Sequence, residues 1–337
     1  MKNKIKLFAV ISAMVMALTL GLAGCSDPSS SSSDSSGSGA SSGSSETGDS
    51  GNTGGGGSSG TGSSGETFSE GFVEVTGTTI TGTESWTPKS SVFVSGRQIT
   101  IPDLIVCDHE VTQAEYAKYC KYGSDSPSSS YGAGDNYPAY YVNWYDAVVY
   151  CNLRSIDEEL TPAYKIGDET DPRKWSGIVG DAGNGYCGPS SSNSTWNALT
   201  YDKKANGYRL PTEAEWEYIA REACSSNTTY SGSDTIDDVA WYWDNSSSKT
   251  HEVKGKNANS LGIYDMSGNV FEWCYDWYSS SINSSTADTG ADSGSYRVIR
   301  GGSWLDSASY CTVSSRYSDN PNCRSYGLGF RVVRSAN

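Results

Sequence analysis

Hydrophobic residues are distributed unevenly along the 337-residue chain. An apolar run spans Leu7–Leu22, residues 26–66 hold neither an aromatic nor a basic side chain, and all ten tryptophans lie within 86–304. This pattern predicts a signal peptide at 1–25, a disordered tether at 26–66 and one globular domain at 67–337. The tether prediction depends on composition. A segment with 18 Ser and 12 Gly among its 41 residues cannot bury enough apolar surface to offset the entropy that it would lose on becoming ordered.

Within the globular part, three helix starts are indicated by capping residues. Thr112 and Thr212 are each followed three positions later by glutamate, and Asn143 is followed by an aspartate in the same place. Short β-branched or aromatic runs predict strands at 92–94, 99–101, 297–299 and 330–333. A few helices with many short strands and long loops indicate an α+β fold.

The start of the chain predicts export and lipid attachment. Three lysines precede the apolar run, which ends in Leu22-Ala-Gly-Cys25. This tetrapeptide resembles the lipobox of bacterial lipoproteins, in which the cysteine is acylated and becomes the new N-terminus. The alternative is an ordinary secretory signal that happens to contain a cysteine. The lipobox implies a membrane anchor at Cys25 and, with the tether, an outer membrane lipoprotein on a bacterial cell surface.

Net charge narrows the range of partners. The chain carries a formal charge of −15, and removing Lys2, Lys4 and Lys6 with the signal leaves 21 basic residues against 39 acidic ones. Nucleic-acid binding depends on Lys and Arg neutralising phosphates. The charge therefore argues against a nucleic-acid partner.

Motifs of common catalytic sites are absent from the sequence. Only His109 and His251 are available for histidine chemistry, and no His-Glu-x-x-His, Gly-x-Ser-x-Gly or P-loop pattern occurs. His109 lies between two acids and is interpreted as a paired group. Eight cysteines follow Cys25 without a Cys-x-x-Cys pair, and their spacing does not give a disulfide pattern. Motifs alone do not support an enzyme or a required cofactor.

One segment has spacing suited to a metal. Residues 265–272 place Asp265 and Glu272 seven positions apart around a Gly-Asn turn. Oxygen donors on a tight turn are the ligands that Ca²⁺ uses. The alternative, which the residues alone leave open, is a turn whose acids accept hydrogen bonds from backbone amides.

Several separated segments together resemble the formylglycine-generating enzyme, or sulfatase-modifying factor, family. The matching segments are His109-Glu-Val-Thr-Gln-Ala-Glu-Tyr116, Val142-Asn-Trp-Tyr-Asp-Ala-Val-Val-Tyr-Cys151, Asn206-Gly-Tyr-Arg-Leu-Pro-Thr-Glu-Ala-Glu-Trp-Glu-Tyr218, Leu261-Gly-Ile-Tyr-Asp-Met-Ser-Gly-Asn-Val-Phe-Glu-Trp-Cys274, Arg300-Gly-Gly-Ser-Trp304 and Gly329-Phe-Arg-Val-Val333. The resemblance covers roughly residues 100–335 and implies a C-type-lectin-like fold. It also implies calcium ligands at Asp265, Gly268, Val270 and Glu272, although the enzyme has Asn where Asp265 stands.

The family's pair of catalytic cysteines is incomplete in this sequence. The enzymes oxidise a sulfatase cysteine with two cysteines that follow the Gly-Gly-Ser motif, and here the second position is Cys311 but the first is Asp306. A carboxylate cannot supply the thiolate that this chemistry needs. The sequence therefore predicts no enzymatic activity.

The segment after Trp304 resembles the variable region of diversity-generating retroelement proteins, including spirochaete variable lipoproteins. In those systems template adenines, often in AAC codons, are copied with errors, and the outcomes include Asn, Ser, Tyr, Asp, Gly, Cys and Leu but never Trp, Met, Lys, Glu or Gln. Fifteen residues within a variable region of about 297–334 all belong to the permitted set: Leu305, Asp306, Ser307, Ser309, Tyr310, Ser315, Tyr317, Ser318, Asp319, Asn320, Asn322, Cys323, Ser325, Tyr326 and Gly327. Between them stand residues expected to be fixed: Ala308, Cys311, Val313, Arg316, Pro321, Arg324 and Leu328.

These observations predict a surface lipoprotein that binds an unidentified protein or cell-surface ligand through the fifteen residues. Tyr supplies rigid contact area, and Ser, Asn, Asp and Gly supply adaptable hydrogen bonds, as in antibody loops. The alternatives are a formylglycine-generating or related oxidative enzyme, and a structural envelope lipoprotein with no specific ligand. A polar C-terminal segment that does not vary is the alternative to the variable region.

Overall fold

The computed structural model describes residues 70–123 and 125–336. The predicted signal peptide, Cys25 and the tether lie outside these residues. The helices are α2 (Gln113–Ala117), α3 (Trp144–Asp157), α4 (Ser194–Asn197), α5 (Glu213–Ala220) and α6 (Ile236–Val239), with 3₁₀ turns η1 (Pro172–Lys174) and η2 (Ala308–Tyr310). The strands are β1 (Phe72–Val75), β2 (Thr78–Thr81), β3 (Gln98–Ile101), β4 (Leu104–Cys107), β5 (Tyr164–Lys165), β6 (Val179–Asp181), β7 (Gly185–Cys187), β8 (Thr200–Tyr201), β9 (Phe271–Trp277), β10 (Arg297–Arg300), β11 (Tyr317–Asp319), β12 (Leu328–Gly329) and β13 (Val333–Ser335).

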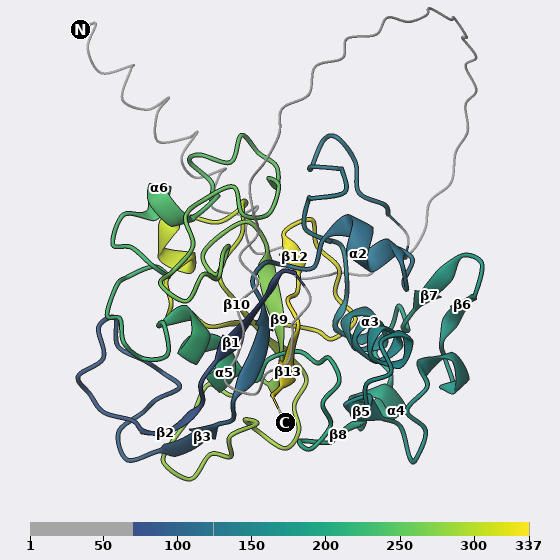
Figure 1. Ribbon diagram of the computed structural model, residues 1–337, viewed down its shortest axis with the longest axis horizontal. Helices are drawn as coiled ribbons and strands as arrows, with labels where there is room; N and C mark the ends of the chain where they lie inside the picture. Colours follow the sequence, from purple (N-terminus) through teal and green to yellow (C-terminus); the bar gives the residue numbers. More distant parts are fainter. Residues whose placement is uncertain (1–69, 124, 337) are drawn as a thin grey trace, which may run out of the picture.

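The strands form small, mostly antiparallel sheets, which confirms the α+β prediction. A four-stranded sheet has the order β11-β10-β9-β12, and a three-stranded sheet has the order β1-β4-β13. Only the pairing of β12 with β9 is parallel among these strands. Figure 1 shows β9 near the middle of the body, with α2 and α3 on one side and α5 and α6 on the other.

The three predicted helix starts are confirmed. Thr112, Asn143 and Thr212 each accept a hydrogen bond from the backbone amide three residues ahead, and the acid at that position accepts one from the cap residue's amide. Two otherwise unpaired backbone amides are thus satisfied at each start. These contacts are local, so their residues determine the helix starts without help from the rest of the chain.

The strand predictions are confirmed in part. Residues 99–101 lie in β3 and residues 297–299 in β10, but 92–94 form a bend because the amides of Val92 and Phe93 bind the Ser90 hydroxyl. In the run 330–333, only the last residue belongs to a strand, β13. The Val332 carbonyl instead accepts a hydrogen bond from the amide of Cys107, the last residue of β4, and the Phe330 carbonyl accepts one from the amide of Val111, which lies between β4 and α2.

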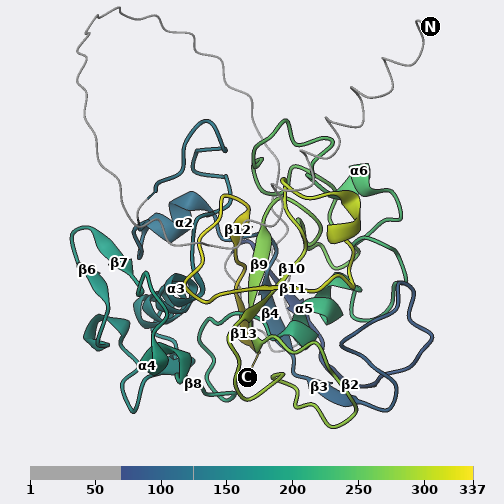
Figure 2. The same cartoon turned by 180° about the vertical axis from the view of Figure 1, so that it is seen from behind.

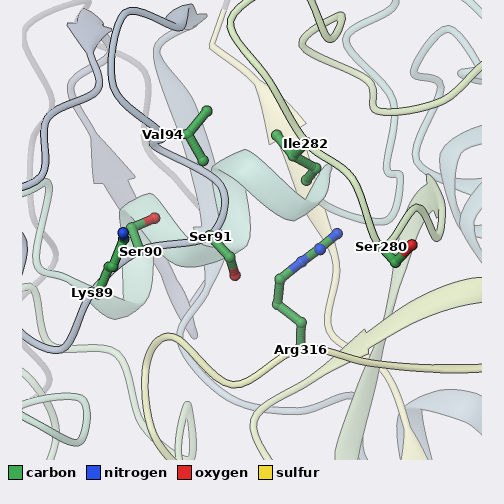
Figure 3. Close-up of a pocket in the computed structure, with 7 residues that line it drawn as sticks. All are labelled: Lys89, Ser90, Ser91, Val94, Ser280, Ile282 and Arg316. Atoms are coloured by element: carbon green, nitrogen blue, oxygen red, sulfur yellow. The ribbon is translucent and has the colours of Figure 1, made fainter.

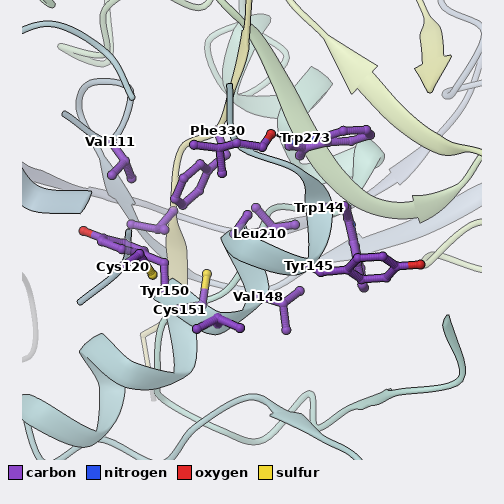
Figure 4. Close-up of a cluster of buried hydrophobic side chains, with 14 of the residues drawn as sticks. Val111, Cys120, Trp144, Tyr145, Val148, Tyr150, Cys151, Leu210, Trp273 and Phe330 are labelled. Atoms are coloured by element: carbon purple, nitrogen blue, oxygen red, sulfur yellow. Dashed lines mark hydrogen bonds between the residues drawn. The ribbon is translucent and has the colours of Figure 1, made fainter. Parts of the chain in front are cut away.

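The core encloses helix α3, which is buried along almost its whole length. Its first residue, Trp144, donates from its indole to the Cys274 carbonyl at 3.0 Å, and Trp273 donates to the Val142 carbonyl at 2.9 Å. Figure 4 shows these tryptophans with Leu210 and Phe330 in one cluster. These two hydrogen bonds therefore hold the start of α3 against the central strand β9. Strand β9 pairs with β10 and β12, the strands that flank the segment described below.

Seven cysteines in the described part of the chain hold free thiols: Cys107, Cys120, Cys151, Cys187, Cys224, Cys274 and Cys311. All but Cys224 are buried. Within the same residues, the helices are too short or too polar for any of them to cross a membrane.

Candidate functional site

The predicted ligand-binding residues lie on the segment that connects β10 to β12. The chain leaves β10 after Arg300, forms η2, and returns alongside β10 as the edge strand β11. Ile299 of β10 faces Tyr317 of β11 in the antiparallel register. Figure 2 shows this segment, coloured yellow, along the edge of the four-stranded sheet.

Accessibility along this segment agrees in part with the predicted division between changeable and fixed residues, since Ala308, Arg316 and Arg324 are partly accessible. Four of the seven residues expected to be fixed are buried: Cys311, Val313, Pro321 and Leu328. Thirteen of the fifteen candidate positions are partly or fully accessible, and we call them the candidate face: Leu305, Asp306, Ser307, Ser309, Tyr310, Ser315, Tyr317, Ser318, Asp319, Asn320, Asn322, Ser325 and Tyr326.

Two candidate positions, Cys323 and Gly327, do not belong to this face. Cys323 is 2% exposed, and Gly327 is also buried. A Cβ atom at position 327 would lie 2.7 Å from the Ser303 hydroxyl oxygen and 3.2 Å from a Leu305 methyl group. We therefore leave both residues out of the contact surface, because neither can present a side chain to a ligand.

The backbone of the segment is anchored by a buried ion pair. Arg316 donates from Nε and Nη2 to the two carboxylate oxygens of Glu213, at 2.6 Å each, and from Nη1 to the Ser279 carbonyl at 3.0 Å. Glu213 is the first residue of α5 and also accepts from Arg300 at 3.2 Å. Such a bidentate pair restricts orientation as well as distance. Arg316 thereby holds the start of β11 against the helix.

A second arginine anchors the return of the segment. Arg324 donates to both carboxylate oxygens of Asp146, a buried residue in the first turn of α3. Backbone bonds add to this attachment, since the amides of Trp144 and Tyr141 donate to the carbonyls of Pro321 and Ser325 at 3.0 Å each. The main chain is therefore held by residues outside the segment.

Aromatic side chains within the face contact one another. Tyr310 and Tyr317 are stacked with ring centroids 4.7 Å apart. Tyr326 stacks on Tyr131 at 4.1 Å and also contacts Tyr141 at 5.0 Å. Tyrosine pairs of this kind present large amphipathic areas with few rotatable bonds.

The sequence prediction missed three aromatic residues that border the face. Tyr131 and Tyr141 contact Tyr326, and the amide of Trp243 donates to the Asp306 carbonyl at 2.9 Å. The Trp243 side chain is 58% exposed. These residues lie 60 to about 200 positions from their partners in the chain, so no local spacing could have indicated them.

A shallow pocket of about 270 Å³ lies beside Arg316. Figure 3 shows Arg316 reaching between the segments that carry Ser90 and Ile282. The two basic residues that line the pocket are both paired with acids, Lys89 with Glu84 at 2.6 Å and Arg316 with Glu213. The pocket therefore adds apolar contact next to the face rather than an uncompensated charge.

The two positions of the family's catalytic pair are poorly suited to thiol chemistry. Burial raises the pKa of the Cys311 thiol, and the nearby Asp306 carboxylate raises it further. The Asp306 carboxylate accepts a hydrogen bond from the Ser303 hydroxyl, and burial raises the pKa of this acid. A fully buried thiol with a raised pKa holds little of the reactive thiolate. His109 is paired with Asp108 and Glu115, as predicted.

The two acids among the predicted calcium ligands both accept hydrogen bonds from donors of the protein itself. Both oxygens of Glu272 accept from Arg331, at 2.6 and 2.8 Å, and the Trp216 indole donates to one of them at 2.7 Å. Asp265 accepts from the Lys254 amide at 2.7 Å, and burial raises its pKa to about 6. Within the described residues, no group of three or more His, Cys, Asp or Glu is placed to hold a metal. The guanidinium already supplies the positive charge that calcium would bring to Glu272.

Residues 66–336 match the model of the sulfatase-modifying factor enzyme 1-like domain. The chain is 37% identical over 268 residues to Chaperone protein LppX of Paenibacillus barcinonensis, a match that covers 74% of this chain and 85% of that one. It is 36% identical over 161 residues to the formylglycine-generating enzyme of Streptomyces coelicolor, which covers 42% of this chain and 51% of the enzyme.

Among solved structures, Treponema denticola variable protein 1 is similar throughout most of its length. The TM-score is 0.62 at 32% sequence identity, and the alignment covers 78% of this chain and 94% of that one. This likeness and the domain match confirm the expected formylglycine-generating enzyme-type, C-type-lectin-like fold.

The Arg316 anchor generates a stability prediction. We expect Arg316→Ala to lower the free energy of unfolding by about 3 kcal/mol, because it leaves the buried Glu213 carboxylate with one weaker partner. Urea unfolding of the full-length chain measures this change. The control is Arg173→Ala, which removes an arginine that pairs with Asp171 but is 46% exposed, and which we expect to cost less than about 1 kcal/mol. Equal losses for the two variants would contradict the anchoring role.

The Glu272–Arg331 pair generates a prediction about metal removal. We expect a chelator to leave the thermal unfolding midpoint unchanged relative to a sample with added calcium, because Arg331 already neutralises Glu272. Differential scanning calorimetry measures the midpoint. A drop that added calcium reverses, and that Asp265→Ala abolishes, would instead establish the calcium site.

Proposed function

The chain belongs to the family of sulfatase-modifying factor enzyme 1-like domains, and from this premise we propose that it is a non-catalytic binding protein of that family. The candidate face binds a protein or another cell-surface ligand. A retroelement diversifies the residues of the face, and the domain is displayed on a bacterial cell by a lipid attached to Cys25.

The main support is the separation of the anchors from the face along one segment. Thirteen candidate positions are accessible, while Cys311, Val313, Pro321 and Leu328 between them are buried and Arg316 and Arg324 are paired with acids of α5 and α3. Side chains that make few internal contacts can change with little effect on stability. Residues that fill the core or hold an ion pair cannot. A surface built in this way tolerates replacement of its contact residues while the backbone keeps its position.

The chemistry of the face favours a macromolecular ligand. Its residues are mainly Tyr, Ser, Asn and Asp, which combine rigid contact area with adaptable hydrogen bonding. The two acids and the lack of Lys or Arg among the thirteen positions argue against phosphate-rich partners. Trp243 and Tyr131, which border the face, supply aromatic contacts that stay constant when the thirteen residues change.

The similarity to Treponema denticola variable protein 1 supports diversification of this segment. All fifteen candidate residues belong to the set that miscopied AAC codons encode, and Trp304 at the start of the segment does not. The two buried positions, Cys323 and Gly327, belong to the diversified codons in this proposal but contribute no ligand contact.

An enzymatic role is not part of the proposal. Formation of formylglycine in this family needs a reactive cysteine pair, and Asp306 replaces one member while burial suppresses ionisation of Cys311. The chain uses the family's scaffold for recognition instead of oxidation.

Display at the cell surface rests on the sequence of residues 1–66. Acylation of Cys25 anchors the chain in the outer membrane, and the Ser- and Gly-rich tether at 26–66 separates the domain from the lipid. A tether of this length would give the face access to ligands at a distance from the membrane. No nucleic acid and no cofactor takes part.

Diversification predicts a distinct pattern in DNA. We expect a near-identical repeat of the segment's coding sequence close to the gene, with AAC codons at the fifteen positions and a reverse transcriptase gene beside it. Sequencing the gene from many cells of one strain then shows substitutions concentrated at those codons, while the codons of Val313, Arg316 and Pro321 stay constant. Substitutions spread evenly over the gene, with no repeat nearby, would contradict retroelement diversification.

The proposed lack of catalysis has a direct biochemical test. We expect no aldehyde to form when the full-length chain is incubated with oxygen and a sulfatase peptide that contains the target cysteine. Mass spectrometry of the peptide measures conversion, and a formylglycine-generating enzyme serves as the positive control. Conversion that is lost in Cys311→Ala would show that the chain is an enzyme.

A further inference from the structure

A second cavity, away from the candidate face, contains a buried arginine without an acidic partner. The cavity has a volume of about 360 Å³ and lies between the α4–β8 region and the loop at 287–292. Its walls include Asn197, Tyr201, Tyr275, Trp277 and Arg297. None of the thirteen residues of the candidate face lines it. A cavity of this size holds one small molecule.

The Arg297 guanidinium lies against two indole rings. Its Cζ atom lies 3.8 Å from the ring centroid of Trp144 and 3.5 Å from that of Trp277. Residue 297 is 2% exposed. Cation–π contacts hold the group in place, so its N–H donors lie at the edges of the planar group.

Those donors are mostly unused. Nη1 donates to the Tyr275 carbonyl at 2.6 Å, and Nη2 makes a long bond of 3.4 Å to the Asn197 carbonyl. Nε is buried and has no hydrogen-bond partner. The edge formed by Nε and Nη2 therefore has spare hydrogen-bonding capacity, and a buried donor without a partner is energetically costly.

The other fully buried arginines of the described residues differ from Arg297. Four of them bind glutamates, as Arg209, Arg221, Arg300 and Arg331 do. Arg97 has no such acid, but each of its three nitrogens donates to a backbone carbonyl. Only Arg297 in this group combines the lack of a hydrogen-bonded acid with an unpartnered Nε.

The charge of Arg297 is poorly compensated within the protein. Burial lowers the pKa of its guanidinium to about 9, although Tyr275 and Asp276 act in the opposite direction. Asp276 does not supply a full countercharge, since burial and the neighbouring Glu213 raise the pKa of that acid to about 7. A bound anion would supply the missing charge.

We propose that this cavity binds a monomeric sugar acid whose carboxylate pairs with the guanidinium of Arg297, which lines the cavity. A planar carboxylate can accept two parallel N–H···O bonds from a guanidinium. The side chains of Tyr201 and Tyr275 also line the cavity and add aromatic contact area for the C–H groups of the sugar. At the mouth, the Thr289 hydroxyl and the exposed Asp292 carboxylate are available to sugar hydroxyls.

The site is tested by titrating the full-length chain with D-glucuronate and, separately, with D-glucose as the neutral comparator. Isothermal titration calorimetry measures both. We expect saturable binding of glucuronate at least about tenfold tighter than that of glucose, since only glucuronate engages the guanidinium. Equal affinities, or no saturable binding of glucuronate, would overturn the proposal.

Variants at the cavity mouth keep the test independent of folding. Ala198 lines the cavity at an exposed position, so Ala198→Trp fills the mouth without disturbing Arg297. We expect this variant to lose glucuronate binding at an unchanged thermal midpoint. Ala133→Trp, at an exposed alanine outside the cavity, is the matched control and should bind as the parent chain does. Undiminished binding in Ala198→Trp would show that glucuronate binds elsewhere.

Discussion

The buried carboxylates of the short helix α5 bind the arginines that organise the C-terminal third of the domain. Glu213 accepts from Arg300 and Arg316, and Glu217 accepts from Arg300 and Arg221. Removing one partner from such a pair leaves a buried charge without compensation, which costs about 3–5 kcal/mol. The helix therefore specifies one position for β10 and for the start of β11. The shape of the candidate face depends on that position.

This arrangement separates the contacts that hold the backbone from the accessible side chains. The segment after β10 is attached through its arginines, its buried residues and its backbone, and these contacts leave thirteen side chains accessible. Asp146 in α3 anchors Arg324 by an ion pair, in the same way that Glu213 anchors Arg316. Because both anchors involve side chains outside the face, changes within the face leave them intact. A scaffold with this property suits repeated replacement of its contact residues, as in antibody loops.

Residue 306 distinguishes the chain from the formylglycine-generating enzymes that it resembles. The chain keeps the Arg300-Gly-Gly-Ser motif and Cys311, but residue 306 is an aspartate. The sequence was sufficient to recognise this difference, because the two positions follow the motif at a short spacing. The structure adds that Cys311 is buried below the face, where it packs among Ala240 and Tyr242. Cys311 is therefore part of the packed interior.

The sequence by itself determined the features that depend on neighbouring residues. Capping at Thr212 predicts α5, and thirteen of the fifteen positions expected to change are accessible, with Cys323 and Gly327 as the exceptions. Only the tertiary structure decided the long-range pairings. Glu213 and Arg316 are 103 positions apart. The residues around each of them predict neither that its side chain is buried nor which residue it pairs with. Hydrogen bonds within one turn are specified by adjacent residues, whereas an ion pair in the core depends on how distant elements pack and exclude water.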